Sequence, residues 1–320
     1  MKKILVTGAC GQIGSELVVH LGKKFGKENV ISSDIKRPAS IIKEFSTFMY
    51  LNVLDTHMLA REVVENEIDT IFHMAAILSA TGEQNPQFAY EVNMQGLMNV
   101  LEVARRKEVQ KVITPSSIAV FGPDAPKEMT PEDTSLNPTT MYGVTKVAGE
   151  KLMQYYHLKY GLDTRSLRYP GIISSETLPG GGTTDFAVDM YIHAVLNQPY
   201  TCFVTEDTPL PFMYMPDAIR AILELAEAEE DKLTRRVYNV HAMRLTPADI
   251  VDSIRKYIPE FRCEYQPDYR QDIAESWPHS IDDSAARKDW GWLPQYNLDD
   301  MTRDMLDKLR EKHQKKVVHL

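Results

Sequence analysis

The sequence predicts an α/β fold: a doubly wound parallel sheet with helices on both faces, followed by a smaller C-terminal lobe. Two observations carry this prediction. Over the first 170 residues, short apolar runs alternate with longer amphipathic stretches, and such runs are typical of parallel strands that are covered on both faces. A glycine-rich turn also joins the first apolar run to the first helical stretch. Strands and helices in this alternating order form a parallel sheet with crossover helices.

The individual elements follow from these runs in chain order. The predicted strands are residues 3–7, 29–33, 70–74, 111–116 and 164–169. The predicted helices between them are residues 12–25, 57–65 and 88–107. After residue 170 the alternation weakens, and the expected elements are a helix at 185–197, a strand at 237–240 that returns to the main sheet, and a helix at 247–258.

Composition excludes several classes of protein. The 320 residues carry 36 Lys and Arg against 45 Asp and Glu, a net charge of -9, so nucleic acid and anionic membranes are poor partners. No run reaches the roughly 18 apolar residues of a membrane span, and we expect a cytoplasmic protein. The three cysteines, Cys10, Cys202 and Cys263, form no C-x-x-C pair, which predicts neither a disulfide framework nor a metal site.

The glycine-rich turn predicts a dinucleotide site. Gly8 permits a tight turn, Gly11 lets the backbone approach a pyrophosphate, and Gly14 lets helix and strand pack closely. About 20 residues later, Asp34 ends the second strand, where a carboxylate accepts hydrogen bonds from ribose hydroxyls and repels a 2′-phosphate. This favours NAD, while nearby Lys36 and Arg37 keep NADP open as an alternative. The predicted cofactor residues of this region are Gly8, Gly11, Gln12, Ile13, Gly14, Asp34 and Ile35.

We therefore expect residues 1–170 to form a Rossmann-type NAD-binding domain. Residues 171–320 are expected to be mainly a substrate-binding lobe, interleaved with late strands and helices of the main domain.

Tyr142 and Lys146 form the candidate catalytic pair. Their i, i+4 spacing places a phenol and an ammonium on one face of a helix. A phenol that acts as a base at neutral pH needs its pKa lowered by about three units, and we expect Lys146, helped by an oxidised nicotinamide, to lower it. Ser117, at the end of the strand 111–116, is expected to hold the substrate oxygen. Tyr-x-x-x-Lys alone is common on helix surfaces, but its conjunction with the glycine turn and Ser117 favours catalysis.

Together these motifs resemble the extended short-chain dehydrogenase/reductase family, the group of the UDP-galactose 4-epimerases. The resemblance is carried by the three glycines, the segment 73–76, Asn93, Ser116–Ser117 and the Tyr142/Lys146 pair. It implies NAD, a Ser-Tyr-Lys triad and a homodimer formed through the two helices flanking Tyr142 and Asn93. It also implies cofactor contacts at Asn52, Val53, Ala75, Ala76, Asn93, Tyr142, Lys146, Pro170 and Ile172. At position 52 the family usually has Asp; Asn keeps the acceptor and loses the charge.

A glycine-rich segment in the C-terminal lobe bears on the substrate. Residues 179–185, PGGGTTD, precede the predicted helix 185–197. Backbone N–H groups, hydroxyls and the helix dipole there could hold a small carboxylate. The alternative is an ordinary helix N-cap at Thr184 or Asp185.

Five further stretches extend the resemblance, to the short-chain type of L-threonine 3-dehydrogenase. They are PSSIAVFGP, LRYPGIIS, PGGGTTDFAVDM and the segments 213–218 and 276–282. The resemblance implies NAD-dependent oxidation of the L-threonine β-hydroxyl to 2-amino-3-oxobutyrate. The implied substrate residues are Ser79, Ser116, Tyr142, Gly182, Thr183 and Thr184. No acidic residue is assigned to the substrate ammonium.

Two other functions are weighed against this one. The first is an NAD-dependent sugar-nucleotide 4-epimerase, which needs basic residues for a diphosphate; residues 174–208 contain no Lys or Arg. The second is a catalytically silent NAD-sensing protein, which the intact Ser117, Tyr142 and Lys146 disfavour.

Overall fold

A seven-stranded sheet forms the centre of the computed structural model, which describes residues 1–178 and 180–318, with side chains through residue 314. The strand order is β10-β6-β5-β4-β1-β2-β3, and every pair is parallel. The strands are β1 (Ile4–Thr7), β2 (Val30–Asp34), β3 (Thr47–Tyr50), β4 (Thr70–His73), β5 (Lys111–Ser117), β6 (Asp163–Tyr169) and β10 (Val237–Asn239). The predicted α/β fold with a parallel sheet is confirmed, and residues 237–239 join the main sheet as expected.

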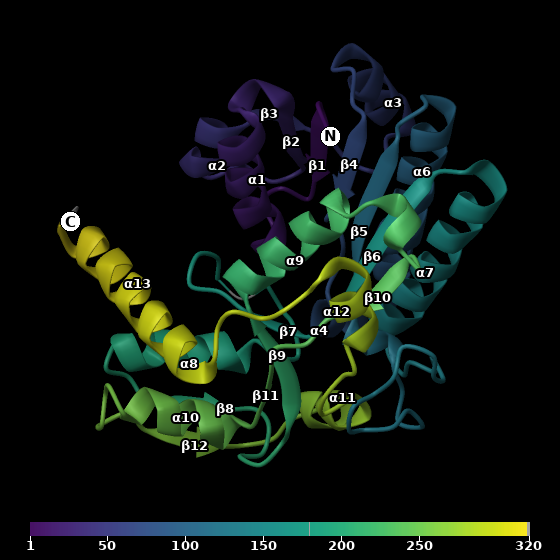
Figure 1. Ribbon diagram of the computed structural model, residues 1–320. Helices are drawn as coiled ribbons and strands as arrows, with labels where there is room; N and C mark the ends of the chain where they lie inside the picture. Colours follow the sequence, from purple (N-terminus) through teal and green to yellow (C-terminus); the bar gives the residue numbers. More distant parts are fainter. Residues whose placement is uncertain (179, 319–320) are drawn as a thin grey trace.

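Helices cover both faces of this sheet (Figure 1). On one face α1 (Gln12–Phe25) and α9 (Met215–Glu227) bury their apolar stripes against the strands. On the other face the same is true of α3 (Thr56–Glu65), α6 (Gly96–Arg106) and α7 (Met141–Tyr160). The strand order reverses between β1 and β4, and ligands of open parallel sheets bind at the carboxyl ends of the strands beside such a point.

The second lobe is built on two small sheets. One contains β7 (Gly171–Ile173), β9 (Leu210–Tyr214) and β11 (Met243–Leu245), and the other β8 (Tyr200–Cys202) and β12 (Cys263–Tyr265). The helices α8 (Phe186–Val195), α10 (Pro247–Arg255) and α13 (Leu298–Val318) pack around a separate core in this lobe. Pro170 alone separates β6 of the main sheet from β7, so the chain passes between the lobes within one residue.

The remaining helices are short. They are α2 (Ser40–Phe45), α4 (Ser79–Gln84), α5 (Pro86–Tyr90), α11 (Arg270–Ser276) and α12 (Ser284–Trp290), with 3₁₀ turns at Lys27–Asn29, Ile118–Val120 and Glu230–Lys232. None of the helices in the described residues is both long and apolar enough to cross a membrane.

The helical stretch expected at 88–107 is present over residues 86–106, but it is not a uniform α-helix. The chain forms α5, then a π-helical turn at Glu91–Gln95, then α6. The π turn carries Asn93, which is buried, accepts a hydrogen bond from the Ile77 N–H (2.8 Å) and donates to the Ile77 carbonyl (3.1 Å). Wider turns of this kind cluster at functional sites. Apolar periodicity continues through such a turn, so it could not reveal it.

Candidate active site

A cavity of about 430 Å³ opens at the carboxyl ends of the central strands, with walls from both lobes. It brings together most of the site residues predicted from the sequence. Those that line it are Gly8, Gly11, Gln12, Ile13, Gly14, Ala76, Ser79, Ser116, Ser117, Tyr142, Lys146, Pro170, Ile172, Gly182, Thr183 and Thr184. Pro179, which begins the predicted glycine-rich segment, lies outside the described residues.

The glycine turn at one end of this cavity leaves no room for side chains. Gly8 has a φ of +68°, and a Cβ there would lie 2.5 Å from the Ala75 nitrogen. A Cβ at Gly14 would meet the Gly8 carbonyl oxygen. Gly11 caps helix α1 without a side-chain hydrogen bond, so first-turn N–H groups remain for an anion.

The side chain of Gln12 supports the same use of this end. Its buried Nε2 has no hydrogen-bond partner among the described residues, and Gln12 lines the cavity. An unpaired buried donor is costly, and a pyrophosphate oxygen would satisfy it. The residues present therefore fit a dinucleotide.

Six predicted cofactor residues do not line the large cavity. Asp34 accepts hydrogen bonds from the Cys10 N–H (2.8 Å) and the Lys36 N–H (2.9 Å), which fix its carboxylate at the end of β2. Asn52 is exposed and accepts from the Leu54 N–H (3.0 Å). The six are Asp34, Ile35, Asn52, Val53, Ala75 and Asn93; their cofactor contacts stay predictions.

Helix α7 positions the catalytic pair. Thr140 caps the helix by accepting from the Gly143 N–H (3.1 Å), which places Tyr142 in the first turn. One turn later, the Lys146 Nζ lies 5.4 Å from the centre of the Tyr142 ring and donates to the Pro115 carbonyl (2.7 Å). Ser117, at the end of β5, faces the same cavity. The three residues therefore meet although 25 residues of chain separate Ser117 from Tyr142.

Without NAD, burial dominates the electrostatics of this pair. Burial raises the pKa of Tyr142 to about 12, and the nearby Ser117 hydroxyl opposes only part of that rise. Burial lowers the pKa of Lys146 to about 8, against the charge of Glu150, which raises it. Desolvation penalises the charged form of each group, and its size could not be judged from the sequence. Without cofactor the phenol is thus protonated at neutral pH.

The opposite wall carries small hydroxyl side chains. Ser79, at the start of α4, lies 3.2 Å from Thr183, oxygen to oxygen, and both are buried. Asp185 accepts from the N–H groups of Gly181 (2.8 Å) and Gly182 (2.7 Å) and makes no side-chain cap to α8. Two of the backbone donors expected to hold a carboxylate are therefore already bound.

Ser116 is engaged elsewhere. Its hydroxyl donates to the Glu150 carboxylate (2.5 Å) in the buried interior, so it would have to leave that bond to contact a substrate.

The cavity also contains residues that sequence reasoning missed, among them Thr81, Leu178 and Trp277. Trp277 belongs to a loop more than 100 residues after Tyr142, and no local pattern indicated its place. No group of three or more His, Cys, Asp or Glu in the described part of the chain could hold a metal ion.

Comparisons with known proteins identify the family of the chain. The model of the "NAD dependent epimerase/dehydratase family" matches residues 4–240. An uncharacterized epimerase/dehydratase of Staphylococcus saprophyticus is 50% identical over 99% of this chain and 100% of its own length. The crystal structure of L-threonine dehydrogenase from Phytophthora infestans is 52% identical over 97% of this chain and 99% of that one, with a TM-score of 0.94.

A structure described as a monomeric L-threonine 3-dehydrogenase from a metagenome database is also similar. It is 49% identical over 97% of this chain and 99% of that one, with a TM-score of 0.93. The residues that the family model matches include the glycine turn and the helix with Tyr142 and Lys146. The chain belongs to the NAD-dependent epimerase/dehydratase family, and its cofactor is NAD.

Proposed function

We propose that the protein oxidises the β-hydroxyl of L-threonine with NAD, giving 2-amino-3-oxobutyrate. The observation that carries the proposal is that one cavity contains both Ser117, Tyr142 and Lys146 and a wall of small hydroxyl side chains, Ser79, Thr183 and Thr184. Similar structures at about half identity are L-threonine dehydrogenases, which supports the same substrate.

The dimensions and charge of the cavity support a small substrate. Its volume of about 430 Å³ includes the glycine turn, so a dinucleotide fills much of it. The neighbouring segment 174–208 contains no Lys or Arg to meet a second diphosphate. Both observations disfavour the sugar-nucleotide epimerase.

The chemistry assigned to the chain is proton transfer and orientation. In the reaction the O–H and Cβ–H bonds of threonine break and a C=O bond forms. NAD, when bound, supplies the acceptor for the hydride and, in its oxidised form, a positive charge. Tyr142 receives the hydroxyl proton at its phenol oxygen, and Ser117 donates a hydrogen bond to the substrate oxygen. Lys146 stabilises the phenolate that must form first, because burial alone keeps the phenol protonated.

Substrate orientation is assigned to the second wall. The hydroxyls of Thr183 and Thr184 lie just before α8, where the helix dipole favours a negative charge, and we assign the substrate carboxylate to them. Ser79 is assigned to the amino group. Accordingly, residues 1–170 would mainly bind NAD, residues 171–320 would contribute the carboxylate site, and the protein would act in threonine catabolism.

We also propose a homodimer through α5, α6 and α7. Of these helices, α5 and α7 expose large apolar side chains: Leu158 is 74% exposed, and the others are Phe88, Tyr90, Val144, Tyr155 and Tyr160. Exposed apolar patches mark association surfaces. Leu158→Asp should halve the mass measured by light scattering while leaving the fold intact by circular dichroism. A wild-type protein that is already monomeric, like the metagenomic enzyme, would refute the dimer.

The activity is tested by NADH absorbance after adding NAD and L-threonine. L-Serine, D-threonine and UDP-galactose serve as controls. We expect NADH with L-threonine and little with the others. Epimerisation of UDP-galactose without NADH formation from L-threonine would overturn the proposal.

A further inference from the structure

Glu150 extends the catalytic face of helix α7. It follows Lys146 by four residues, as Lys146 follows Tyr142, and this spacing places the three side chains in one row along the helix. Glu150 is 5% exposed. A charged carboxylate this deeply buried requires hydrogen-bond or ion-pair partners. The partners of Glu150 indicate its role.

The Glu150 carboxylate joins two neighbouring strands to the helix. Its Oε1 accepts from the Ser116 hydroxyl (2.5 Å) and the Arg168 Nε (2.9 Å), and its Oε2 accepts from the Arg168 Nη2 (2.8 Å). Ser116 and Arg168 are register partners on β5 and β6. The next residues along those strands are Ser117 and Tyr169, and both line the catalytic cavity.

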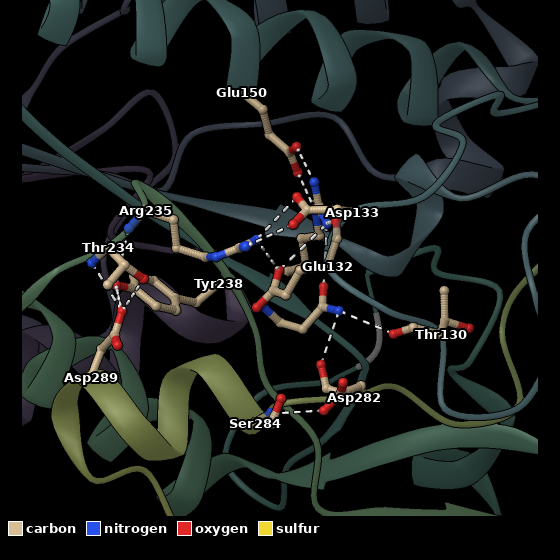
Figure 2. Close-up of polar contacts among 12 residues, drawn as sticks. Thr130, Glu132, Asp133, Glu150, Thr234, Arg235, Tyr238, Asp282, Ser284 and Asp289 are labelled. Carbon is tan, nitrogen blue, oxygen red and sulfur yellow. Dashed lines mark hydrogen bonds and ion pairs between the residues drawn. The ribbon is translucent and has the colours of Figure 1, made fainter.

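Arg168 continues the buried network away from the cavity. Its Nη1 donates to the Glu132 carbonyl (2.9 Å), and the Glu132 Oε1 accepts from the Asn239 N–H of β10 (2.7 Å). Arg235 pairs with Asp133 beside it (3.0 Å). Figure 2 shows Glu150 pointing into this cluster, with Glu132, Asp133 and Arg235 on the far side. The Glu150 carboxylate is thus held by side chains of β5 and β6, and Arg168 is itself held in place by further contacts.

Glu150 also lines a small cavity together with Lys146. A second cavity of about 30 Å³ is lined by both residues, together with Asn93 and Ser116. That volume is enough for a water molecule. Because Glu150 is buried, solvent screens its interaction with Lys146 weakly.

The other ionisable groups around Lys146 leave Glu150 as its counter-charge. His73, from β4, lines the small cavity, but burial lowers its pKa to about 3, so it is neutral. Tyr142 is protonated without cofactor. Cys10, Lys36 and Asp185 line the large cavity, and none of them is among the causes that shift the pKa of Lys146. Glu150 is the carboxylate whose charge raises the pKa of Lys146 against the effect of burial.

We propose that Glu150 is a positioning residue for the reaction at Tyr142 and Lys146. Its carboxylate fixes the ends of β5 and β6 against α7 and keeps the Lys146 ammonium charged. The effect on turnover rests on the proposed dehydrogenase activity, whereas the effect on the charge of Lys146 does not. Two separate measurements follow from this division.

The first measurement reads the charge of Lys146 without substrate or NAD. Reductive methylation by formaldehyde, with cyanoborohydride as the hydride donor, requires the neutral amine, and peptide mass spectrometry gives the methylated fraction of Lys146 at each pH. Wild type should show a midpoint at pH of about 8. In Glu150→Gln the midpoint should fall by about one unit. An unchanged midpoint in that variant would overturn the proposal whatever the substrate is.

A matched control and a second variant complete this test. Glu62 is a buried carboxylate on α3 that also pairs with an arginine (2.7 Å), so Glu62→Gln should leave the Lys146 midpoint unchanged. If Glu150→Gln does not fold, Glu150→Asp serves instead. It keeps the charge but shortens the reach, so the midpoint should stay near 8 while kcat falls by about tenfold. Wild-type kcat in Glu150→Asp would contradict the positioning role.

The second measurement separates positioning from substrate contact at Ser116. If Ser116 acts through Glu150, Ser116→Ala lowers kcat severalfold and leaves the KM for L-threonine unchanged. A raised KM with unchanged kcat would mean that the hydroxyl binds the substrate, and would overturn this part of the proposal. Absence of L-threonine oxidation in wild type refutes the proposed function, but the methylation result still decides the role of Glu150.

Discussion

The two ends of the large cavity are held in shape by different forces. At the dinucleotide end, backbone meets backbone: Gly8 lies against Ala75, and Gly14 against the Gly8 carbonyl. At the reaction end, buried polar side chains set the geometry: Lys146 donates to Pro115, and Glu150 joins Ser116 to Arg168. NAD binding at the first end should therefore be sensitive to added side-chain volume. Turnover at the second end should be sensitive to changes of charge and pH.

Tyr142→Phe is expected to have the largest effect, and it affects only the reaction end. Loss of the phenol oxygen removes the group that receives the proton, so kcat should fall by about 10³-fold. NAD affinity, measured by calorimetric titration, should stay within about twofold because the ring and its packing are kept. Turnover at the wild-type rate would refute the assignment of Tyr142.

Gly14→Ala is the counterpart at the dinucleotide end. The added methyl group meets the Gly8 carbonyl oxygen, and overpacking of this kind should raise the Kd for NAD by about thirtyfold. At saturating NAD, kcat should remain near wild type.

Gly82→Ala is a suitable control, since a Cβ there makes an ordinary 3.4 Å contact with Ala89. Equal NAD affinity in wild type and Gly14→Ala would show that the close approach does not matter.

A smaller effect is expected from Thr183→Val on the substrate wall. The substitution keeps the shape and removes the hydroxyl that lies 3.2 Å from Ser79. The KM for L-threonine should rise about tenfold, with the KM for NAD unchanged. Thr201→Val, at an exposed position on β8, is the control. A change confined to the KM for NAD would mean that Thr183 contacts the dinucleotide and not L-threonine.

The smallest effect is the change of kcat/KM with pH in the wild-type enzyme. The phenol must lose its proton, so kcat/KM should rise with pH. Burial lowers the pKa of Lys146 to about 8. Above that value the ammonium is lost as fast as phenolate is gained, because the pKa of Tyr142 is higher still, so the rise should end in a plateau. Rates in a constant-ionic-strength buffer series from pH 6 to about 10 test this. A rate that keeps rising past pH 9 would contradict the role of Lys146.

The sequence predicted best what depends on neighbouring residues. Helix α1 has the bounds 12–25 that were expected, because the glycine turn and the apolar period mark both its ends. Strand β3 was not predicted. It is an edge strand with both terminal residues exposed, so its four residues carry no buried run.

Features of the site that depend on residues far apart in the chain could not be predicted from the sequence. Trp277 reaches the cavity only because the second lobe folds back over it. The sequence suggested that Lys146, helped by an oxidised nicotinamide, would lower the pKa of Tyr142. That prediction stands for the NAD complex, but the sequence did not reveal that burial alone raises the pKa of Tyr142 to about 12. Desolvation depends on how many atoms surround a group, and spacing along a helix does not reveal that number.

Pro170, the single residue between β6 and β7, is not a point at which the chain can be cut into two independent lobes. A fragment that ends at Pro170 would keep six strands of the main sheet but lose β10, which covers the edge of β6. It would also lose α9, whose apolar side packs on that sheet. Such a fragment would expose an unpaired edge and an apolar face, both of which promote aggregation. The two lobes are therefore not exchangeable modules, and a chimera with another lobe must carry residues 215–239 along with the N-terminal part.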